Sequence, residues 1–251
     1  MKGTVVVDCF PDSVSRYRSG HAVVAVDVVR ATTSAITAAA SGRRCFLVPT
    51  QNAAFELARR LTNALLVGEQ AGTMPSGFHL NNSPVELLGY SDLERPAILL
   101  SSSGTKLCHE ASTCTAAFLG CLRNYASVAA HLAGRFAAIA IIGAGSRGEF
   151  REEDQLCCGW IAEELVRRGY LPGNAQTLAL IREWHGKPAN AWIHNKSASY
   201  LRSSGQTADL DFIFEHIDDL DSLFALRGGE VIVESVAGLS AGAEAVAARR
   251  W

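Results

Sequence analysis

The sequence lacks the patterns that mark zinc proteins and nucleic-acid-binding proteins. Its seven cysteines include no C-x-x-C pair, and its seven histidines show no H-E-x-x-H or comparable ligand spacing. No cluster of Lys and Arg is long enough to follow a phosphate backbone, and a formal net charge of -2 gives no overall basic field. A zinc site is therefore not indicated, and we expect no nucleic-acid partner.

The sequence has no long apolar run, and we expect no signal peptide. Stretches such as AAIAIIGAG are far shorter than the roughly 20 residues of a membrane-spanning helix, and the start MKGTVVVDCF goes directly into a strand-like pattern. Most cysteines stand among apolar neighbours, which favours reduced, buried thiols. We therefore expect a cytoplasmic protein with no membrane partner.

What the sequence does contain is an alternation of short β-rich runs and longer alanine-rich runs of helical period. The predicted strands are TVVVD, HAVVAVD, CFLVP, ALLVG, AILLS, AAFLG and AAIAIIG. Helices are predicted over 31–41, 52–61, 125–133 and 153–168, with one more near Lys106. This alternation predicts an α/β fold with a largely parallel sheet, in which ligands gather beyond the carboxyl ends of the strands.

Length and composition bound the domain organisation. A chain of 251 residues with 48% hydrophobic and 19% charged residues can bury a large core, as one domain or as two closely packed ones. We predict one region over 1–251, with a division into two packed α/β subdomains near residue 170 as the alternative. Beyond Tyr170 the pattern is mainly helical to about Ser203, and the runs DFIFEHID, LFALRGG and EVIVESV follow. A homo-oligomer is compatible with this composition.

The stretch VDVVRATTS, 26–34, places charged and hydroxyl side chains where a strand ends. Asp27 closes the run AVVAVD. Arg30, Thr32 and Thr33 stand at the start of the next predicted helix, where unpaired N–H groups attract anions. An arginine fork suits a phosphate, whereas Asp27 fits such a site only through a cation such as Mg²⁺. The structural alternative is an Asp27–Arg30 ion pair with threonine caps.

Two further carboxylates stand at comparable junctions. Glu69 follows the predicted strand ALLVG, and Asp154 lies one helical turn before two cysteines, so that it should face inward. Each carboxylate alone fits a helix cap or a solvated charge. Their recurrence at strand-to-helix junctions favours one shared site with Asp27.

The stretch GEQAGTMPSGFHLNNSP, 68–84, breaks the alternation with three glycines, two prolines and no periodicity. Structureless loops beyond about 12–15 residues are usually functional or disordered. The N-N-S-P end suits a fixed turn before a helix that starts near Val85, so we expect an ordered loop more than a site.

Two glycine-containing loops also invite a phosphate interpretation. In LLSSSGTKL, 99–107, three serines, Thr105 and Lys106 surround a glycine at a helix start and could hold a second anion; the alternative is an ordinary capped turn. In IAIIGAGSRGEF the glycines fit G-x-G-x-x-G, the dinucleotide pattern. Four acidic residues between 149 and 154 would repel a pyrophosphate there, so we do not expect NAD.

In order and spacing, the segments VDVVRATTS, GEQAGTMPSGFHLNNSP, SSSGTK, CLRNYASVA and GSRGEFREEDQLCCG resemble the 2-phosphosulfolactate phosphatases, the ComB-like family of coenzyme M synthesis. The resemblance runs from about Val5 past residue 225. It implies a Mg²⁺-dependent acid phosphatase with a three-layer α/β/α fold. It also implies a small anionic phosphate ester, bearing a sulfonate and a carboxylate, as the substrate.

The resemblance extends to individual positions in the family's motifs. It implies that Asp27, Glu69 and Asp154 hold the metal, and that these three act with Arg30 in catalysis. The residues expected to bind phosphate or the rest of the substrate are Thr32, Thr33, His79, Asn82, Ser83, Ser103, Gly104 and Thr105.

The chain departs from the family pattern at two of these positions. His79 replaces the acid of G-F-D, and Ser103 replaces the amide of T-T-N-G-T. Because a site built around one polar group discriminates strongly against ligands that lack it, we expect substrate choice to have shifted from phosphosulfolactate. The alternatives are a phosphatase for another phosphorylated acid, a sugar or a nucleoside, and a non-catalytic anion-binding protein on the same scaffold.

Overall fold

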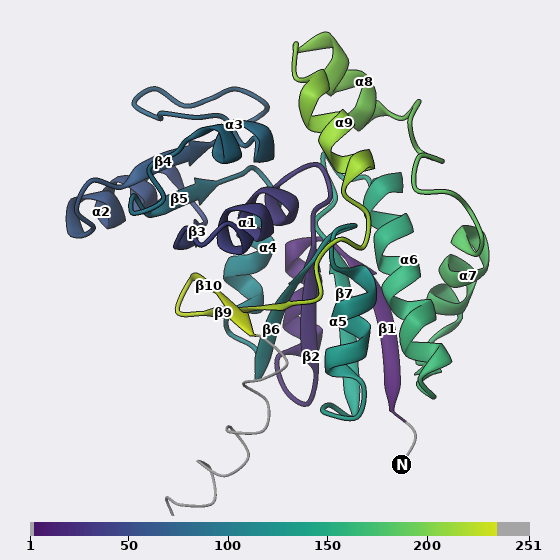
Figure 1. Ribbon diagram of the computed structural model, residues 1–251. Helices are drawn as coiled ribbons and strands as arrows, with labels where there is room; N and C mark the ends of the chain where they lie inside the picture. The colour runs from purple at the N-terminus through teal and green to yellow at the C-terminus, as the bar shows by residue number, and fades with distance from the viewer. Residues whose placement is uncertain (1–2, 235–251) are drawn as a thin grey trace, which may run out of the picture.

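The computed structural model describes residues 3–234, and within them ten strands form one sheet (Figure 1). Their order from edge to edge is β4, β5, β3, β10, β9, β6, β2, β7, β1, β8. The strands span Thr4–Cys9 (β1), Ala22–Val26 (β2), Cys45–Val48 (β3), Leu65–Gly68 (β4), Ala97–Leu100 (β5), Ala116–Gly120 (β6), Ala138–Gly143 (β7), Leu171–Pro172 (β8), Leu223–Arg227 (β9) and Glu230–Glu234 (β10).

The sheet consists of two parallel blocks joined by an antiparallel hairpin. Strands β4, β5 and β3 pair in parallel, as do β6, β2, β7, β1 and β8. The hairpin of β9 and β10 lies between the blocks and is antiparallel to both β6 and β3. The largely parallel sheet expected from the sequence is therefore confirmed, and β9 and β10 add an antiparallel part that makes the whole sheet mixed.

Helices cover both faces of this sheet. The helices are Ala31–Ala40 (α1), Gln51–Arg60 (α2), Pro84–Gly89 (α3), Gly104–Ala111 (α4), Tyr125–Leu132 (α5), Glu152–Arg167 (α6), Ala175–Trp184 (α7), Lys196–Ser203 (α8) and Thr207–Glu215 (α9), with a 3₁₀ helix at Pro11–Tyr17 (η1). Apolar residues of η1, α1, α3 and α4 form one core with the sheet. Residues of α5 to α9 pack on the other face. Residues of α2 pack on β3, β4 and β5 in a separate, smaller cluster. The three-layer α/β/α prediction is confirmed.

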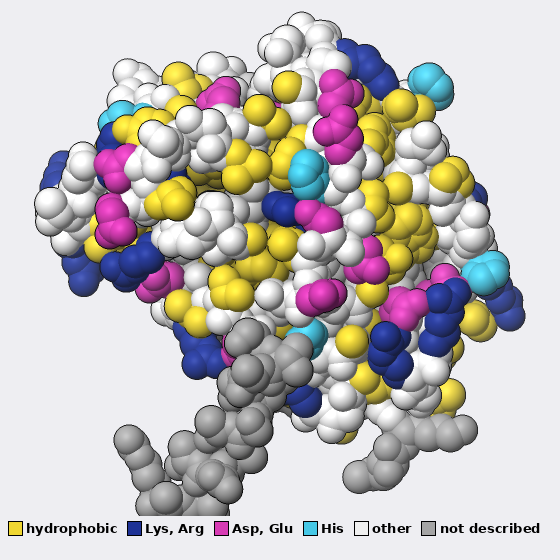
Figure 2. All heavy atoms as spheres, in the orientation of Figure 1, with side chains coloured by type: hydrophobic (Ala, Val, Ile, Leu, Met, Phe, Trp, Pro, Cys, Tyr) yellow, Lys and Arg dark blue, Asp and Glu magenta, His cyan; other side chains and the backbone are white. Residues whose placement is uncertain are grey.

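The buried strands explain this layering. All five residues of β2, AVVAV, are buried, and they alternate between the two cores: Val24 and Val26 contribute to one, Val23 and Ala25 to the other. A strand that is apolar on both sides needs helices on both faces, which is the usual condition of a parallel sheet. Figure 2 shows that acidic and basic side chains are interspersed on the face in view, in keeping with the small net charge.

Several predicted details can be compared with the structure. The run DFIFEHID, which carried no assignment, lies mostly in α9, and the run EVIVESV forms β10 up to Glu234, its last two residues being outside the described part. All seven cysteines are free, and six are buried, as expected. None of the described helices is long and apolar enough to cross a membrane. The division near residue 170 stays a prediction.

A buried ion pair joins the late helices to the sheet. Arg30, which directly precedes α1, donates from its guanidinium to Asp209 of α9, and the two side chains are only 4% and 3% exposed. Asp209 also accepts a hydrogen bond of 2.6 Å from the hydroxyl of Ser83, the N-cap residue of α3. One carboxylate therefore holds α9 against the beginnings of α1 and α3.

Replacing Asp209 with alanine should leave the Arg30 guanidinium buried without its partner. Removing one member of a buried pair typically costs about 3–5 kcal/mol, so we expect Asp209→Ala to lower the free energy of unfolding by roughly that amount in urea denaturation. The control is Asp211→Ala, an exposed carboxylate of the same helix, which should change stability by less than about 0.5 kcal/mol. Similar small effects in both variants would contradict an anchoring role for Asp209.

Candidate active site

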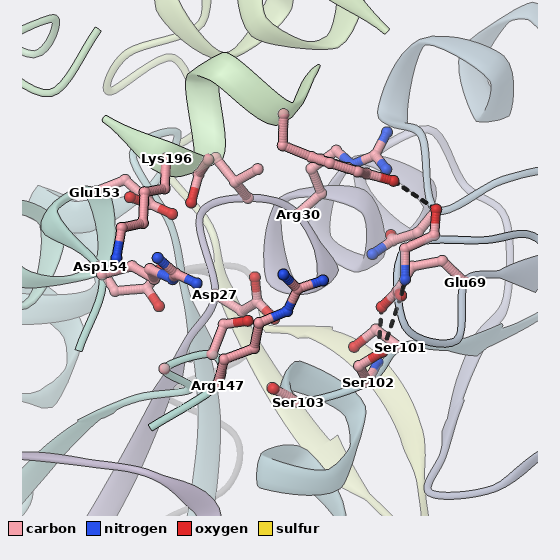
Figure 3. Close-up of a pocket in the computed structure, with 18 of the residues that line it drawn as sticks. Asp27, Arg30, Glu69, Ser101, Ser102, Ser103, Arg147, Glu153, Asp154 and Lys196 are labelled. Carbon is pink, nitrogen blue, oxygen red and sulfur yellow. Dashed lines mark hydrogen bonds between the residues drawn. The ribbon is translucent and has the colours of Figure 1, made fainter. Parts of the chain in front are cut away.

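A cavity of about 540 Å³ lies where the carboxyl ends of strands from both blocks meet (Figure 3). The segments after β2 and β7 line it from one block, and those after β4 and β5 from the other. The starts of α6 and α8 complete the wall. The charged and polar lining residues are Asp27, Arg30, Glu69, Asn82, Ser101, Ser102, Ser103, Ser146, Arg147, Arg151, Glu153, Asp154, Lys196, Ser197 and Tyr200.

Backbone N–H groups hold the two central carboxylates in place. Asp27 follows β2, is 8% exposed and accepts a hydrogen bond from the backbone N–H of Ala31 at the start of α1. Asp154, in the first turn of α6, is 3% exposed, and its Oδ1 accepts from the N–H of Val28 at 2.8 Å and its carboxylate from Gly145. Asp154 therefore ties the loop after β2 to the loop after β7.

Gly104 allows a close approach between α4 and Asp27. A Cβ at this position would lie 2.1 Å from Asp27 Oδ2 and 2.5 Å from the Cβ of Ala31. Atoms do not approach so closely without repulsion, so any side chain here would displace the Asp27 carboxylate. Gly104 therefore shapes the site through the space that it leaves for Asp27.

The carboxylates of the cavity raise one another's pKa. Burial raises the pKa of Asp27 from 3.8 to about 7, and the negative charges of Glu69 and Glu153 add to this, with the hydrogen bond from Ala31 opposing it. Burial, together with the charges of Asp27 and Glu153, also raises the pKa of Asp154. A site that concentrates buried negative charge in this way favours a cation or a shared proton.

Four cationic side chains line the same cavity, and three of them already have an acidic partner. Arg30 pairs with Asp209, whereas Arg151 and Lys196 both pair with Glu149. The fourth, Arg147, is exposed and has no ion pair or side-chain hydrogen bond within residues 3–234. Figure 3 shows its guanidinium in the middle of the cavity, between Asp27 and Glu69. Arg147 is therefore the guanidinium available to an anionic ligand.

The structure brings together seven of the twelve residues predicted from the sequence as parts of a site. Four are the predicted catalytic residues Asp27, Arg30, Glu69 and Asp154, and a fifth, Asn82, comes from the loop between β4 and α3. Ser103 lines the cavity, and Gly104 lies against Asp27. The Asp27–Arg30 ion pair that was the structural alternative does not form, because Arg30 pairs with Asp209.

The other predicted residues support the backbone beside the cavity. Thr32 and Thr33 are buried; Thr32 Oγ1 accepts from the N–H of Asp27, and Thr33 Oγ1 donates to the carbonyl of Val28. Thr105 is buried and forms reciprocal hydrogen bonds with Ser101. These hydroxyls act on the loops that carry the site.

Two more predicted residues lie away from the lining. Ser83 caps α3 and donates to Asp209. His79 is exposed, and its ring Nδ1 accepts a hydrogen bond from the N–H of Leu66 at 2.9 Å. The structure therefore places His79 in a contact with β4, outside the cavity that we expected it to line.

Sequence reasoning missed several lining residues. Arg147 belongs to the G-x-G-x-x-G segment, which we set aside with the dinucleotide hypothesis, although an arginine after a strand end is itself a signal for anion binding. Glu153 is 1% exposed beside Asp154, and Lys196 comes from α8. Nothing in the sequence places α8 at this cavity. The loop 68–84 is ordered, as predicted, and also contributes lining residues at both ends.

The fold and this cavity define an α/β/α protein with an acidic and cationic site at converging strand ends. A family model for 2-phosphosulpholactate phosphatase matches residues 9–228. A probable 2-phosphosulfolactate phosphatase of Deinococcus radiodurans is 32% identical over 211 residues, which cover 82% of this chain and 86% of the relative. One of Clostridium beijerinckii is 28% identical, over 84% and 91% of the two chains.

A third relative, a probable 2-phosphosulfolactate phosphatase of Pseudothermotoga lettingae, is 36% identical over 62% of this chain and 66% of its own. The family model spans nearly all the described residues, including every segment of the cavity. The chain belongs to the 2-phosphosulpholactate phosphatase family. It is a phosphatase, that is, a phosphoric monoester hydrolase.

The raised pKa of Asp27 predicts a pH-dependent stability in metal-free protein. The folded state keeps the Asp27 proton up to about pH 7, whereas the unfolded chain releases it near pH 3.8. The resulting stabilisation is fully present below the lower value and is lost as the pH rises through the higher one. In EDTA, the Tm of the wild type should fall more steeply between about pH 5 and about pH 8 than that of Asp27→Asn. Parallel curves would contradict the raised pKa.

Proposed function

We propose that this phosphatase is Mg²⁺-dependent and acts on a small ester that carries further negative charge, with 2-phosphosulfolactate as the candidate substrate. The supporting observation is the cavity itself, which the buried carboxylates of Asp27 and Asp154 share with Arg147, a guanidinium that has no ion pair within residues 3–234. A metal phosphate complex needs both signs of charge, one to hold the cation and the other to hold the phosphate oxygens.

The carboxylates fit a magnesium site that substrate and water complete. No three His, Cys, Asp or Glu side chains among residues 3–234 converge as a ready-made metal cluster. Mg²⁺, however, is usually bound by one or two carboxylates with phosphate oxygens and water as the remaining ligands. Asp27 and Asp154, whose pKa values are raised by burial and by neighbouring charge, suit this role. When bound, Mg²⁺ would neutralise negative charge on the phosphoryl group.

The chain's own residues would bind and orient the ester. Arg147 would hold phosphate oxygens through its bidentate fork, and the hydroxyl of Ser103 would add a donor from the start of α4. Arg30 would contribute positive charge from the wall while it stays paired with Asp209. Lys196 and Arg151, which share Glu149, could exchange that contact for a second anionic group of the substrate.

The structure weakens the argument for a shift in substrate. The expected shift depended on His79 and Ser103 both lying near the substrate, and only Ser103 lines the cavity. A change from an amide to a hydroxyl at one position removes a donor while it keeps a polar group. We therefore favour 2-phosphosulfolactate, with another phosphorylated acid, a sugar or a nucleoside as the alternative that Ser103 would permit.

Phosphate release from a panel of esters tests the function. We expect 2-phosphosulfolactate to give the highest kcat/KM, EDTA to abolish turnover and Mg²⁺ to restore it. Asp27→Asn should lose turnover at least about 100-fold, since removing the charge weakens the hold on the cation. A better substrate elsewhere in the panel would overturn the substrate proposal, and full activity of a verified metal-free sample would overturn the metal.

Truncation of Arg147 tests the phosphate-binding role. A hydrogen bond to a charged group contributes about 1.5–3 kcal/mol, so Arg147→Ala should lower kcat/KM by roughly 10- to 100-fold without a change in Tm. Arg147→Lys keeps the charge without the fork and should recover only part of the loss. Arg182→Ala, at an exposed position of α7, is the control. Equal activity of Arg147→Ala and this control would exclude the proposed contact.

A further inference from the structure

The carboxylate of Glu69 accepts three hydrogen bonds, all from Gly72 and Ser102 in the cavity wall. Oε1 accepts from the N–H of Ser102 at 2.7 Å. Oε2 accepts from the hydroxyl of Ser102 at 2.9 Å and from the N–H of Gly72 at 2.7 Å. The N–H of Ala71 in turn donates to the Ser102 hydroxyl at 2.7 Å. Glu69 and Ser102 thus link two loops through four hydrogen bonds. Figure 3 shows dashed hydrogen bonds where the labelled Glu69 and Ser102 meet.

The backbone beneath this pair is also fixed. The N–H of Glu69 donates to the carbonyl of Leu100 at 3.0 Å, so the ends of β4 and β5 are held together. Gly68 permits this approach, because a Cβ there would lie 2.2 Å from the same carbonyl oxygen. The Glu69 side chain therefore extends from a rigid position next to the segment that it holds.

The consequence concerns the three successive serines after β5. Ser102 is bound to Glu69, and the hydroxyl of Ser101 accepts from the N–H of Thr105 at 3.0 Å. The hydroxyl of Ser103 has no hydrogen bond within the described chain, and Ser103 lines the cavity. Ser101 keeps its own hydroxyl proton to donate, whereas Ser103 is the one of the three whose hydroxyl makes no hydrogen bond at all within residues 3–234.

We infer that Glu69 is a positioning residue that fixes the Ser101–Ser103 segment, so that Ser103 and the start of α4 face the phosphate. This role rests on the proposed function. It differs from the metal-ligand role expected from the sequence, in which the carboxylate would be directed at Mg²⁺. The hydrogen bonds direct it at loop donors instead, and the loop extends the same hold to α8, where Tyr200 donates to the carbonyl of Gly72.

Hydrogen exchange tests this role without any need for turnover. In Glu69→Gln, one of the two acceptor oxygens becomes an amide donor, so the N–H groups of residues 101–103 and 72 should exchange about tenfold faster or more. Glu110→Gln, at the other end of α4 in a surface pair with Arg18, is the control and should leave these rates unchanged. Unchanged exchange in Glu69→Gln would overturn the inference.

Metal binding separates a positioning residue from a ligand. The Mg²⁺-induced rise in Tm should persist in Glu69→Gln and vanish in Asp27→Asn. Equal loss in the two variants would overturn the inference and make Glu69 a ligand. Because exchange reports on the segment alone, absence of phosphatase activity in the wild type would reject the proposed function and leave the exchange result to decide the positioning.

Ser102→Ala provides a second variant should Glu69→Gln fold poorly. It removes the hydroxyl contacts and keeps the Ser102 N–H bond to Oε1, so we expect a milder effect: KM for the ester raised severalfold with kcat nearly kept. The double variant should then be no worse than Glu69→Gln alone, because both changes act through one contact. Strictly additive losses would contradict a shared role.

Discussion

The constraint on which this structure depends is the burial of like charges at one place. Asp27 and Asp154 are 8% and 3% exposed, and the charge of Asp27 adds to burial in raising the pKa of Asp154. Buried carboxylates are tolerated only where donors or cations compensate them. Here the N–H groups of Ala31 and Val28 donate to them, which requires the loop after β2 to turn back on itself. The hydroxyls of the following helix hold that turn.

The sheet determines what can meet this negative charge. Three successive antiparallel pairings, from β6 through β9 and β10 to β3, set the β4–β5 block in the opposite sense to the block that contains β2 and β7. Figure 1 shows the first block lying across the direction of the second. In a flat sheet this reversal would put the carboxyl ends of the two blocks at opposite edges. Because the first block lies across the second, the loops after strands of both blocks line one cavity, which Asp27 shares with the serine loop after β5. The hairpin of β9 and β10 therefore decides how loops from earlier parts of the chain meet at the site.

The sequence was sufficient for the layers and for the carboxylates. Apolar runs such as AVVAV identify strands buried on both faces, and polar residues directly after them stand out because burial of such groups requires a reason. The sequence was not sufficient to show which distant residues these charged groups would contact. Nothing local indicates that Arg30 pairs with Asp209, 179 positions away, or that α8 brings Lys196 to the cavity. For His79, the sequence suggested a place in the site that the structure does not give it. Its contact with the N–H of Leu66 depends on the path of a long loop, which the sequence does not reveal.

Roles within the cavity follow from what each charged group already binds. Glu69 accepts hydrogen bonds from donors of two loops, so its carboxylate holds these loops in place. Arg30 and Lys196 each have an acidic partner, whereas Arg147 has none among the described residues, and it projects from a short turn closed by hydrogen bonds between Ser146 and Glu149. The turn fixes the backbone of Arg147, so that a ligand has only the side chain left to order. Position in a motif identifies candidate residues, but the occupancy of their hydrogen bonds decides which of them can meet the substrate.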